Sequence, residues 1–223
     1  STVVATGYSL LIVGSVALFG AFRYYKQGLI DIKPAILFAI PSIIAVYLTR
    51  AFLMPAIPDP ILTAPFVIGK DIAIMVLFAI LMILAAVMML RNTKDLKPTS
   101  GEHHYFLVII EGSIVGVVTG ILGAGGGFLI IPALVLLMGM PMKRAVGASL
   151  LIIALKSLIG FIGDIQSGIE FQLPMLAYFF IATFIGMWFA TRIAEKIQGN
   201  QLQKIFAYFT LVIATIILLK ELV

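Results

Sequence analysis

One stretch of sequence decides the fold of this chain: YFLVIIEGSIVGVVTGILGAGGGFLIIPALVLLMGMPM, Tyr105–Met142, in which Glu111 is the only charged residue. It is too long for one membrane helix of about 20 residues, yet long enough for two short ones. Its centre holds the run GAGGG, Gly123–Gly127, which does not suit a helix interior because each Gly there costs roughly 1 kcal/mol relative to Ala. The stretch therefore predicts a Gly-broken pair of helices, the first ending near Leu122 and the second beginning near Phe128.

The rest of the chain is equally apolar. Of the 223 residues, 62% are hydrophobic and 11% are charged, and the mean hydropathy is +1.17. A soluble domain of this length needs more polar residues to cover its surface, so we expect the surface to face lipid. The absence of cysteine excludes disulfides and thiolate metal sites. The net charge of +5 is interpreted as loop cations, so we expect no nucleic-acid partner. We also expect no metal and no cofactor.

Apolar runs predict about eight helical segments in all. They lie near Val3–Phe22, Pro34–Phe52, Ile72–Leu90, Tyr105–Leu122, Phe128–Met142, Ala145–Gly163, Phe171–Thr191 and Ile205–Leu219. The Pro-rich stretch Met54–Pro65 predicts a stiff loop, and the polar residues 92–104 predict a hinge loop between two halves, 1–91 and 105–223. The predicted fold class is an all-α polytopic membrane protein.

The two halves contain a repeat. Shifting the sequence by 140 positions pairs ATGYSLLI, Ala5–Ile12, with AVGASLLI, Ala145–Ile152, at six of eight positions, and Gly20 with Gly160. Duplication is a feature of transporter folds. The second half carries two helices ahead of its copy, whereas the first copy begins directly after Ser1. The repeat therefore predicts a further N-terminal piece of roughly 30 to 40 residues.

Loop charges predict how the halves are oriented. If the helix from Phe128 crosses the membrane, eleven cations lie on one side and three on the other, as the positive-inside rule requires. The eleven are Arg23, Lys26, Lys33, Arg91, Lys94, Lys97, Lys143, Arg144, Arg192, Lys196 and Lys204, and the three are Arg50, Lys70 and Lys220. If that helix returns to its starting side, the count is seven against seven. The first count favours a crossing helix, inverted repeats and a C-terminus outside the cytoplasm.

One block of the sequence resembles a known family. GVVTGILGAGGGFLIIPALVLLMGMPMKRAVGASLLIIALKSLIG, Gly116–Gly160, is similar to the motif block of the sulfite exporter TauE/SafE family, also called the toluene sulfonate uptake permease family. The pattern is a Gly-rich break, a Pro five residues beyond it, a basic pair, and A-x-x-x-S at the start of the next helix. The resemblance extends over essentially the whole chain, although the family's first Gly-rich segment is absent. It implies a multi-pass protein of a bacterial inner membrane that carries small sulfur-containing or organic anions.

The Gly-rich break is the first candidate site. Its candidate substrate-binding residues are Gly123, Gly125, Gly126 and Gly127. They would expose backbone N–H groups beside the positive end of the next helix, which suits an anion. The alternative is close helix packing, since Gly116 and Gly120 already form a G-x-x-x-G face.

Lys156 is the strongest single candidate for a substrate-binding residue. It lies near the middle of its apolar segment, where a charge is expensive and marks a function by default. It is interpreted as a substrate-binding cation next to Ser149 and Ser157. The alternative is a Lys that pairs with an acid or extends to the interface. Val16 stands at the equivalent place in the first repeat, so the site would be asymmetric.

Three further residues have more than one interpretation each. Glu111 is a candidate for proton coupling or for pairing with Lys156, and the alternative is a carboxylate at the interface. Ser9 and Ser149, which the repeat matches, are candidate substrate-binding hydroxyls, and the alternative is helix–helix contact by small polar residues.

Together these features predict a secondary transporter of a small anion, with export as the favoured direction. Sulfite, thiosulfate and organosulfonates are the substrates that the resemblance implies. An integral membrane enzyme or a channel is the alternative. We predict no catalytic residues, because the sequence has no His cluster, carboxylate pair or G-x-S-x-G elbow. The expected partners are the anion and membrane lipid, and the oligomeric state stays open, a homodimer included.

Overall fold

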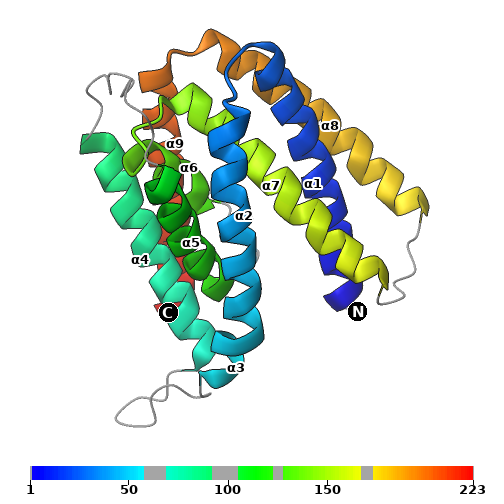
Figure 1. Ribbon diagram of the computed structural model, residues 1–223, viewed down its shortest axis with the longest axis vertical. Helices are drawn as coiled ribbons and strands as arrows, with labels where there is room; N and C mark the ends of the chain where they lie inside the picture. The colour runs from blue at the N-terminus through cyan, green and yellow to red at the C-terminus, as the bar shows by residue number, and fades with distance from the viewer. Residues whose placement is uncertain (1, 58–68, 92–104, 123–127, 167–172, 223) are drawn as a thin grey trace. The chain divides into compact units, whose positions relative to one another are not determined.

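The computed structural model of the protein describes residues 2–57, 69–91, 105–122, 128–166 and 173–222. Within these ranges the regular secondary structure is entirely helical (Figure 1). The elements are α1 (Thr2–Lys26), α2 (Ile32–Leu48), η1 (Thr49–Leu53), α3 (Met54–Ala56), α4 (Lys70–Arg91), α5 (Tyr105–Leu122), α6 (Ile130–Leu136), α7 (Met142–Gln166), α8 (Leu173–Lys196) and α9 (Gly199–Leu222). The predicted all-α polytopic membrane fold is confirmed.

Each apolar run predicted from the sequence overlaps one of these helices. Lipid offers no water to the backbone, so N–H and C=O groups must pair inside the segment, and the α-helix achieves this. Within the described residues, six helical spans are long and apolar enough to cross a membrane, and α2, η1 and α3 together form one of them. The helices α8 and α9 extend beyond their apolar runs, to Lys196 and from Gly199, because helical hydrogen bonds can continue through polar residues.

The second span is a continuous rod with a local irregularity. Pro41 lies inside α2, and η1 is a π-helical turn in which Met54 N–H donates to Thr49 O. The loop predicted from Met54 begins later than expected, since α3 continues to Ala56. Pro55 stands in the first turn of α3, directly after the π-helical turn η1, and supplies no backbone N–H donor there.

The helix predicted from Phe128 is much shorter than expected. It is α6, which has seven residues and a length of about 10 Å, too little to cross a hydrocarbon core of about 30 Å alone. Gly139 ends it with a φ of 63°, and Met140 N–H donates to Leu134 O at 3.0 Å. The helix predicted over Phe128–Met142 is therefore shorter than predicted, whereas the crossing of the membrane by this segment and the side on which the C-terminus lies stay predictions.

The helices form two compact units. The first unit contains residues 1–39 and 143–198, and the second contains residues 40–142 and 199–223. Each unit thus takes parts from both predicted halves of the sequence. The division into repeats at residues 92–104 stays a prediction.

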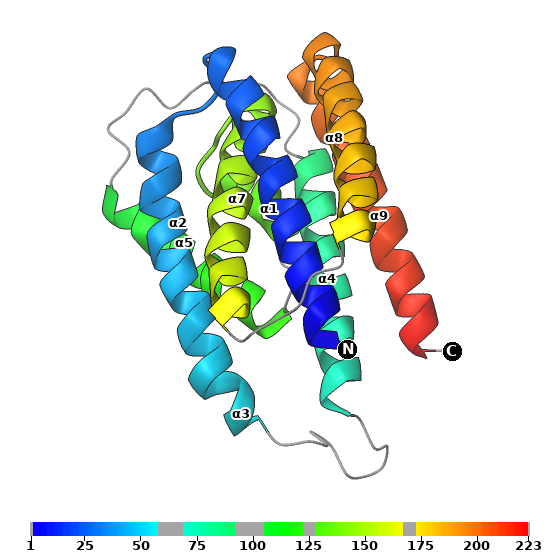
Figure 2. The same cartoon turned by 90° about the vertical axis from the view of Figure 1, so that its right-hand side faces the viewer.

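In the first unit, α1 packs antiparallel to α7 through glycines. A Cβ placed on Gly160 would lie 3.3 Å from Leu10 Cδ1, and one placed on Gly20 would lie 3.0 Å from Leu150 Cδ1. Near the middle of the pair, a Cβ on Gly14 would lie 2.9 Å from Leu158 Cγ. Because these sites have no side chain, the two backbones approach closely, and α8 packs against α1 (Figure 2).

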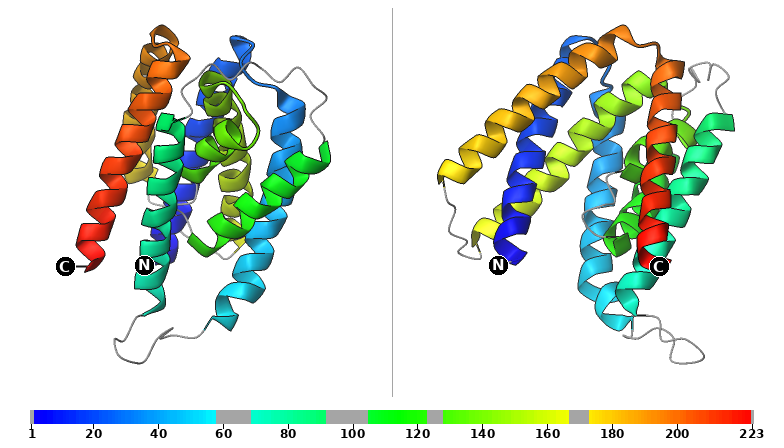
Figure 3. Two further views of the ribbon diagram at one scale, coloured as in Figure 1. Left: turned by 90° about the vertical axis from the view of Figure 1, so that its left-hand side faces the viewer. Right: turned by 180° about the vertical axis from the view of Figure 1, so that it is seen from behind.

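In the second unit, α4 and α9 lie side by side (Figure 3). Their shared core contains Phe78, Met82 and Ala214, and the buried Gln203 Nε2 donates to Met89 O at 2.8 Å.

A second contact joins α2 to α5. Gly116 faces Ser42 and Ala45, and Gly120 faces Thr49, so the predicted G-x-x-x-G packing face is confirmed: Gly116, Gly120.

This contact allows a stability prediction. A Cβ at position 116 would lie 2.5 Å from Ser42 O and 2.8 Å from Ser42 Cα, backbone atoms that have little freedom to move. We expect Gly116→Ala to lower the free energy of unfolding by about 1 to 3 kcal/mol, the usual cost of overpacking. The measurement is the thermal unfolding midpoint in detergent, followed by circular dichroism.

The matched control is Gly186→Ala in α8. Outside the adjacent residues and the backbone of its own helix, no described atom lies within 4 Å of a Cβ placed there, and Ala is favoured over Gly in a helix by about 1 kcal/mol. Its midpoint should stay unchanged or rise slightly. Equal midpoints for the two variants would show that α2 and α5 do not approach at Gly116.

Candidate functional site

Lys156 lies at the centre of α7 and is half-buried. The next residue, Ser157, is 8% exposed, and its Cβ lies 3.1 Å from the position of a Cβ on Gly14. The contacts of Leu10 with Gly160 and of Gly20 with Leu150 define the register of α1 and α7, and this register places Gly14 at the level of Lys156, with Ser15 one residue further along α1. The centre of the helix pair therefore brings a cation and two hydroxyl residues to one depth.

Ser149 lies on the same side of α7 as Lys156. The two residues are seven positions apart, which is two helical turns and about 10 Å. Ser149 is 1% exposed, and its hydroxyl donates to Val146 O at 2.8 Å. This bond satisfies the donor of Ser149 within its own helix, so an incoming anion would have to displace it.

Ser9 is not brought near Ser149. Ser9 is exposed, and the adjacent Leu10 faces Gly160, which lies eleven residues further along α7 than Ser149. Eleven residues of helix span about 16 Å, so the two hydroxyls lie toward opposite ends of the α1–α7 pair. The repeat matches them in sequence, but its antiparallel packing separates them in space.

Glu111 lies in the second unit. It is half-buried in α5, one residue before the buried Gly112. The pairing of Glu111 with Lys156 would join residues of different units and stays a prediction.

The candidate glycines of the Gly-rich break lie outside the described residues: Gly123, Gly125, Gly126 and Gly127. On their two sides, α5 ends at Leu122, and the ring of Phe128 stacks on Phe209 with 6.4 Å between centroids. The following helix, α6, is short, and Leu129 at its N-cap gives no side-chain hydrogen bond. Anion binding by these glycines stays a prediction.

Sequence reasoning missed Ser42. Its side chain is fully buried in α2 beside Gly116, and its Oγ has no hydrogen-bond partner among the described residues. Buried hydroxyls are nearly always paired, so an unpaired one calls for an explanation. The sequence signal was slight: a Ser directly after Pro41 in an apolar run.

Sequence reasoning also missed a polar network in the first unit. Glu195 Oε1 accepts hydrogen bonds from Arg23 at 3.0 Å and from Gln27 Nε2 at 2.6 Å. Lys143 Nζ donates to Glu195 O at 3.0 Å, and Arg23 donates to Trp188 O at 3.2 Å. The network ties together the end of α1, the start of α7 and the end of α8. From the sequence we could predict only that its cations lie in loops, not that they contact Glu195.

Comparison with known proteins agrees with the sequence resemblance. A family model described as sulfite exporter TauE/SafE matches residues 1–217. A probable membrane transporter protein of Methanocaldococcus jannaschii is 29% identical over 174 residues, and the probable membrane transporter protein YunE of Bacillus subtilis is 26% identical over 223 residues. These alignments cover 78% and 90% of this chain.

The same alignments cover 60% of the first relative and 74% of the second. No solved structure gives a significant match. The family match spans nearly the whole chain and includes the motif block from Gly116 to Gly160. The chain belongs to the sulfite exporter TauE/SafE family.

Proposed function

We propose that this protein is a secondary transporter of a small anion, and that sulfite, thiosulfate and organosulfonates are its substrate class. The observation that carries the proposal is Lys156, a half-buried cation at the centre of an apolar membrane helix. A charge at this depth costs about 2.5 to 3.5 kcal/mol on insertion scales, and such residues mark substrate pathways. The names of the relatives support transport, and the family description supports sulfite.

The chemistry around Lys156 favours an anion. The ammonium group brings a positive charge and three N–H donors, and Ser157 adds a hydroxyl from a buried position. Sulfur oxyanions carry negative charge on several acceptor oxygens, and charge-assisted hydrogen bonds to such oxygens are strong. A cationic substrate would be repelled at the same place.

The packing of α1 on α7 supports an inverted repeat. Under the sequence offset of 140, the contact of Leu10 with Gly160 becomes the contact of Leu150 with Gly20, and both contacts are present. Equivalent residues of two antiparallel helices that meet in this reciprocal way are related by a local two-fold axis across the pair. Inverted repeats of this kind let one bundle rock against another around a site near the bilayer midplane. Lys156 lies close to that axis.

Glu111 supplies a proton-coupling group in this scheme. A half-buried carboxylate in a membrane helix can bind and release a proton as its surroundings change during the transport cycle. Proton coupling would let the membrane gradient drive the anion, as in other secondary transporters.

The first test is anion flux. The protein reconstituted in liposomes should move labelled sulfite or thiosulfate, and acetate should move much less. Lys156→Met should reduce the flux about tenfold or more, because it removes the charge that the anion binds. Lys156→Arg should retain part of the flux.

The control variant is Lys220→Met, which removes an exposed Lys near the end of α9. It should transport like the unmodified protein. Flux that Lys156→Met leaves unchanged would assign Lys156 a structural role, and the absence of flux for every anion would exclude the transporter hypothesis.

The second test concerns proton coupling. Glu111→Gln should abolish the stimulation of anion flux by an imposed proton gradient, because Gln cannot carry the proton. Exchange of labelled for unlabelled anion without a gradient should continue. Stimulation that persists in Glu111→Gln would assign the coupling to another group.

The third test concerns orientation. The chain has no cysteine, so single cysteines introduced at Gln198 and Lys220, near the two ends of α9, give unambiguous labelling. A membrane-impermeant maleimide should label Lys220→Cys in intact cells and Gln198→Cys only after permeabilisation. The reverse pattern would place the basic loops outside and contradict the predicted orientation.

A further inference from the structure

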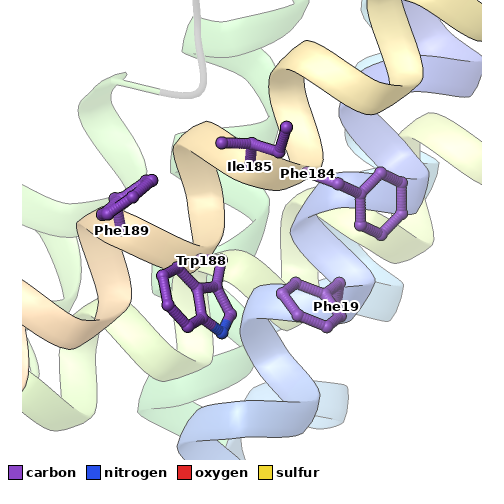
Figure 4. A pocket seen from close by; sticks show the side chains of 5 residues that line it. All are labelled: Phe19, Phe184, Ile185, Trp188 and Phe189. Atoms are coloured by element: carbon purple, nitrogen blue, oxygen red, sulfur yellow. The ribbon is translucent and has the colours of Figure 1, made fainter.

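The first unit has an apolar groove between α1 and α8. Phe19 of α1 and four residues of α8 line a hollow of about 450 Å³ (Figure 4). The four are Phe184, Ile185, Trp188 and Phe189. The rings of Phe19 and Phe184 meet edge to face with 5.3 Å between centroids and form one wall of the groove. The Trp188 indole N–H is the only polar group among the five lining side chains.

The helix that supplies most of this groove is poorly covered. Only 6% of the α8 span is buried, whereas the other five candidate spans are 22% to 39% buried. Other large apolar side chains of α8 are also exposed, among them Phe179, Ile181 and Ile193. The surface of α8 therefore has room for an apolar partner.

One end of the groove is positively charged. The Arg192 guanidinium lies over the Trp188 ring, with its Cζ 4.2 Å from the centroid. Lys196 follows one turn later, and both side chains are exposed. In the described part of the chain neither has an ion-pair partner, because Glu195 is paired with Arg23.

The lining of the groove thus changes from apolar to positively charged along its length. Phe184 and Arg192 are eight residues apart, so about 12 Å of apolar lining leads to the cations. Trp188 lies between them, and Trp is favoured at the level of lipid headgroups. A phospholipid has an apolar acyl chain that leads to an anionic headgroup, so its parts match those of the groove. Basic pockets between membrane helices bind such headgroups.

We propose that the groove between α1 and α8 binds an anionic phospholipid. One acyl chain lies along Phe19, Phe184 and Ile185, and the phosphate contacts Arg192 and Lys196. A second copy of the chain fits this face less well. A two-fold axis along the membrane normal would bring the basic ends of both copies together at one membrane surface, and like charges there oppose association.

The test compares lipids of different charge. Native mass spectrometry of the purified protein, titrated with phosphatidylglycerol or phosphatidylcholine, gives the affinity for each. We expect tighter binding of phosphatidylglycerol. Arg192→Gln should weaken it about fivefold, and Arg192→Gln combined with Lys196→Gln about 25-fold, because each cation near an anionic headgroup contributes a factor of about five. Phosphatidylcholine binding should change little.

Two controls separate the parts of the site. Lys220→Gln removes an exposed cation of α9, in the other unit, and should leave phosphatidylglycerol binding unchanged. Ile185→Ser places a hydroxyl in the apolar groove and should weaken both lipids. Both variants of the basic end and Ile185→Ser alter exposed side chains, so the fold should persist, and circular dichroism checks this.

Several outcomes would overturn the proposal. Equal affinity for the two lipids, or unchanged phosphatidylglycerol binding in the double variant, would exclude a headgroup site at Arg192. Competition of inorganic phosphate as effective as that of the lipid would show a free-anion site. A lipid-free dimer that cross-links through Ile185→Cys would assign the groove to a second copy. The proposal does not depend on the identity of the transported anion.

Discussion

The packing of α1 against α7 through glycines is the contact on which the first unit depends. In a bilayer, lipid tails are as apolar as leucine side chains, so burial of apolar surface does not drive helices together. Association rests on close van der Waals contact instead. Leu10 packs where Gly160 has no side chain, and Leu150 packs where Gly20 has none. The level of every polar residue along α7 relative to α1 follows from this register.

This register determines which residues of α1 lie near Lys156. The approach of Gly14 to Ser157 keeps that hydroxyl buried next to the cation, and the apolar length of α7 separates both from the interfaces. Under the predicted repeat the candidate site is asymmetric, because Val16 occupies the equivalent place on α1. A repeat can therefore provide a symmetric frame while only one copy provides the charge. That arrangement suits a protein with a single central anion site.

The polar end of the first unit has a different role from its centre. There Glu195 accepts bonds from α1, and its backbone carbonyl accepts a bond from Lys143 at the start of α7. In this network Glu195 pairs with Arg23, and among the described residues Arg192 and Lys196 have no ion-pair partner, as the proposed lipid site requires. A phospholipid held there would brace α8, which has few protein contacts of its own. In the two proposals, the charge at the centre and the charges at the end of the unit bind separate ligands.

Hydrophobic runs alone determined the membrane location, the helical class and the segments that form the helices. The physical reason is that lipid forces each backbone to satisfy its own hydrogen bonds, whatever its neighbours are. The Gly116–Gly120 face was also visible, because spacing by four residues places both glycines on one side of a helix. The motif block was enough to indicate the family.

The tertiary structure alone decided which residues meet. It separated Ser9 from Ser149, which the repeat had matched, and it shortened the helix from Phe128 to α6. It also buried the Ser42 hydroxyl and placed Arg192 on Trp188 at the end of an aromatic groove. Sequence periodicity cannot predict such contacts when a membrane helix is apolar on every side. The choice of the packed face then depends on shape complementarity between helices, which exists only once the chain has folded.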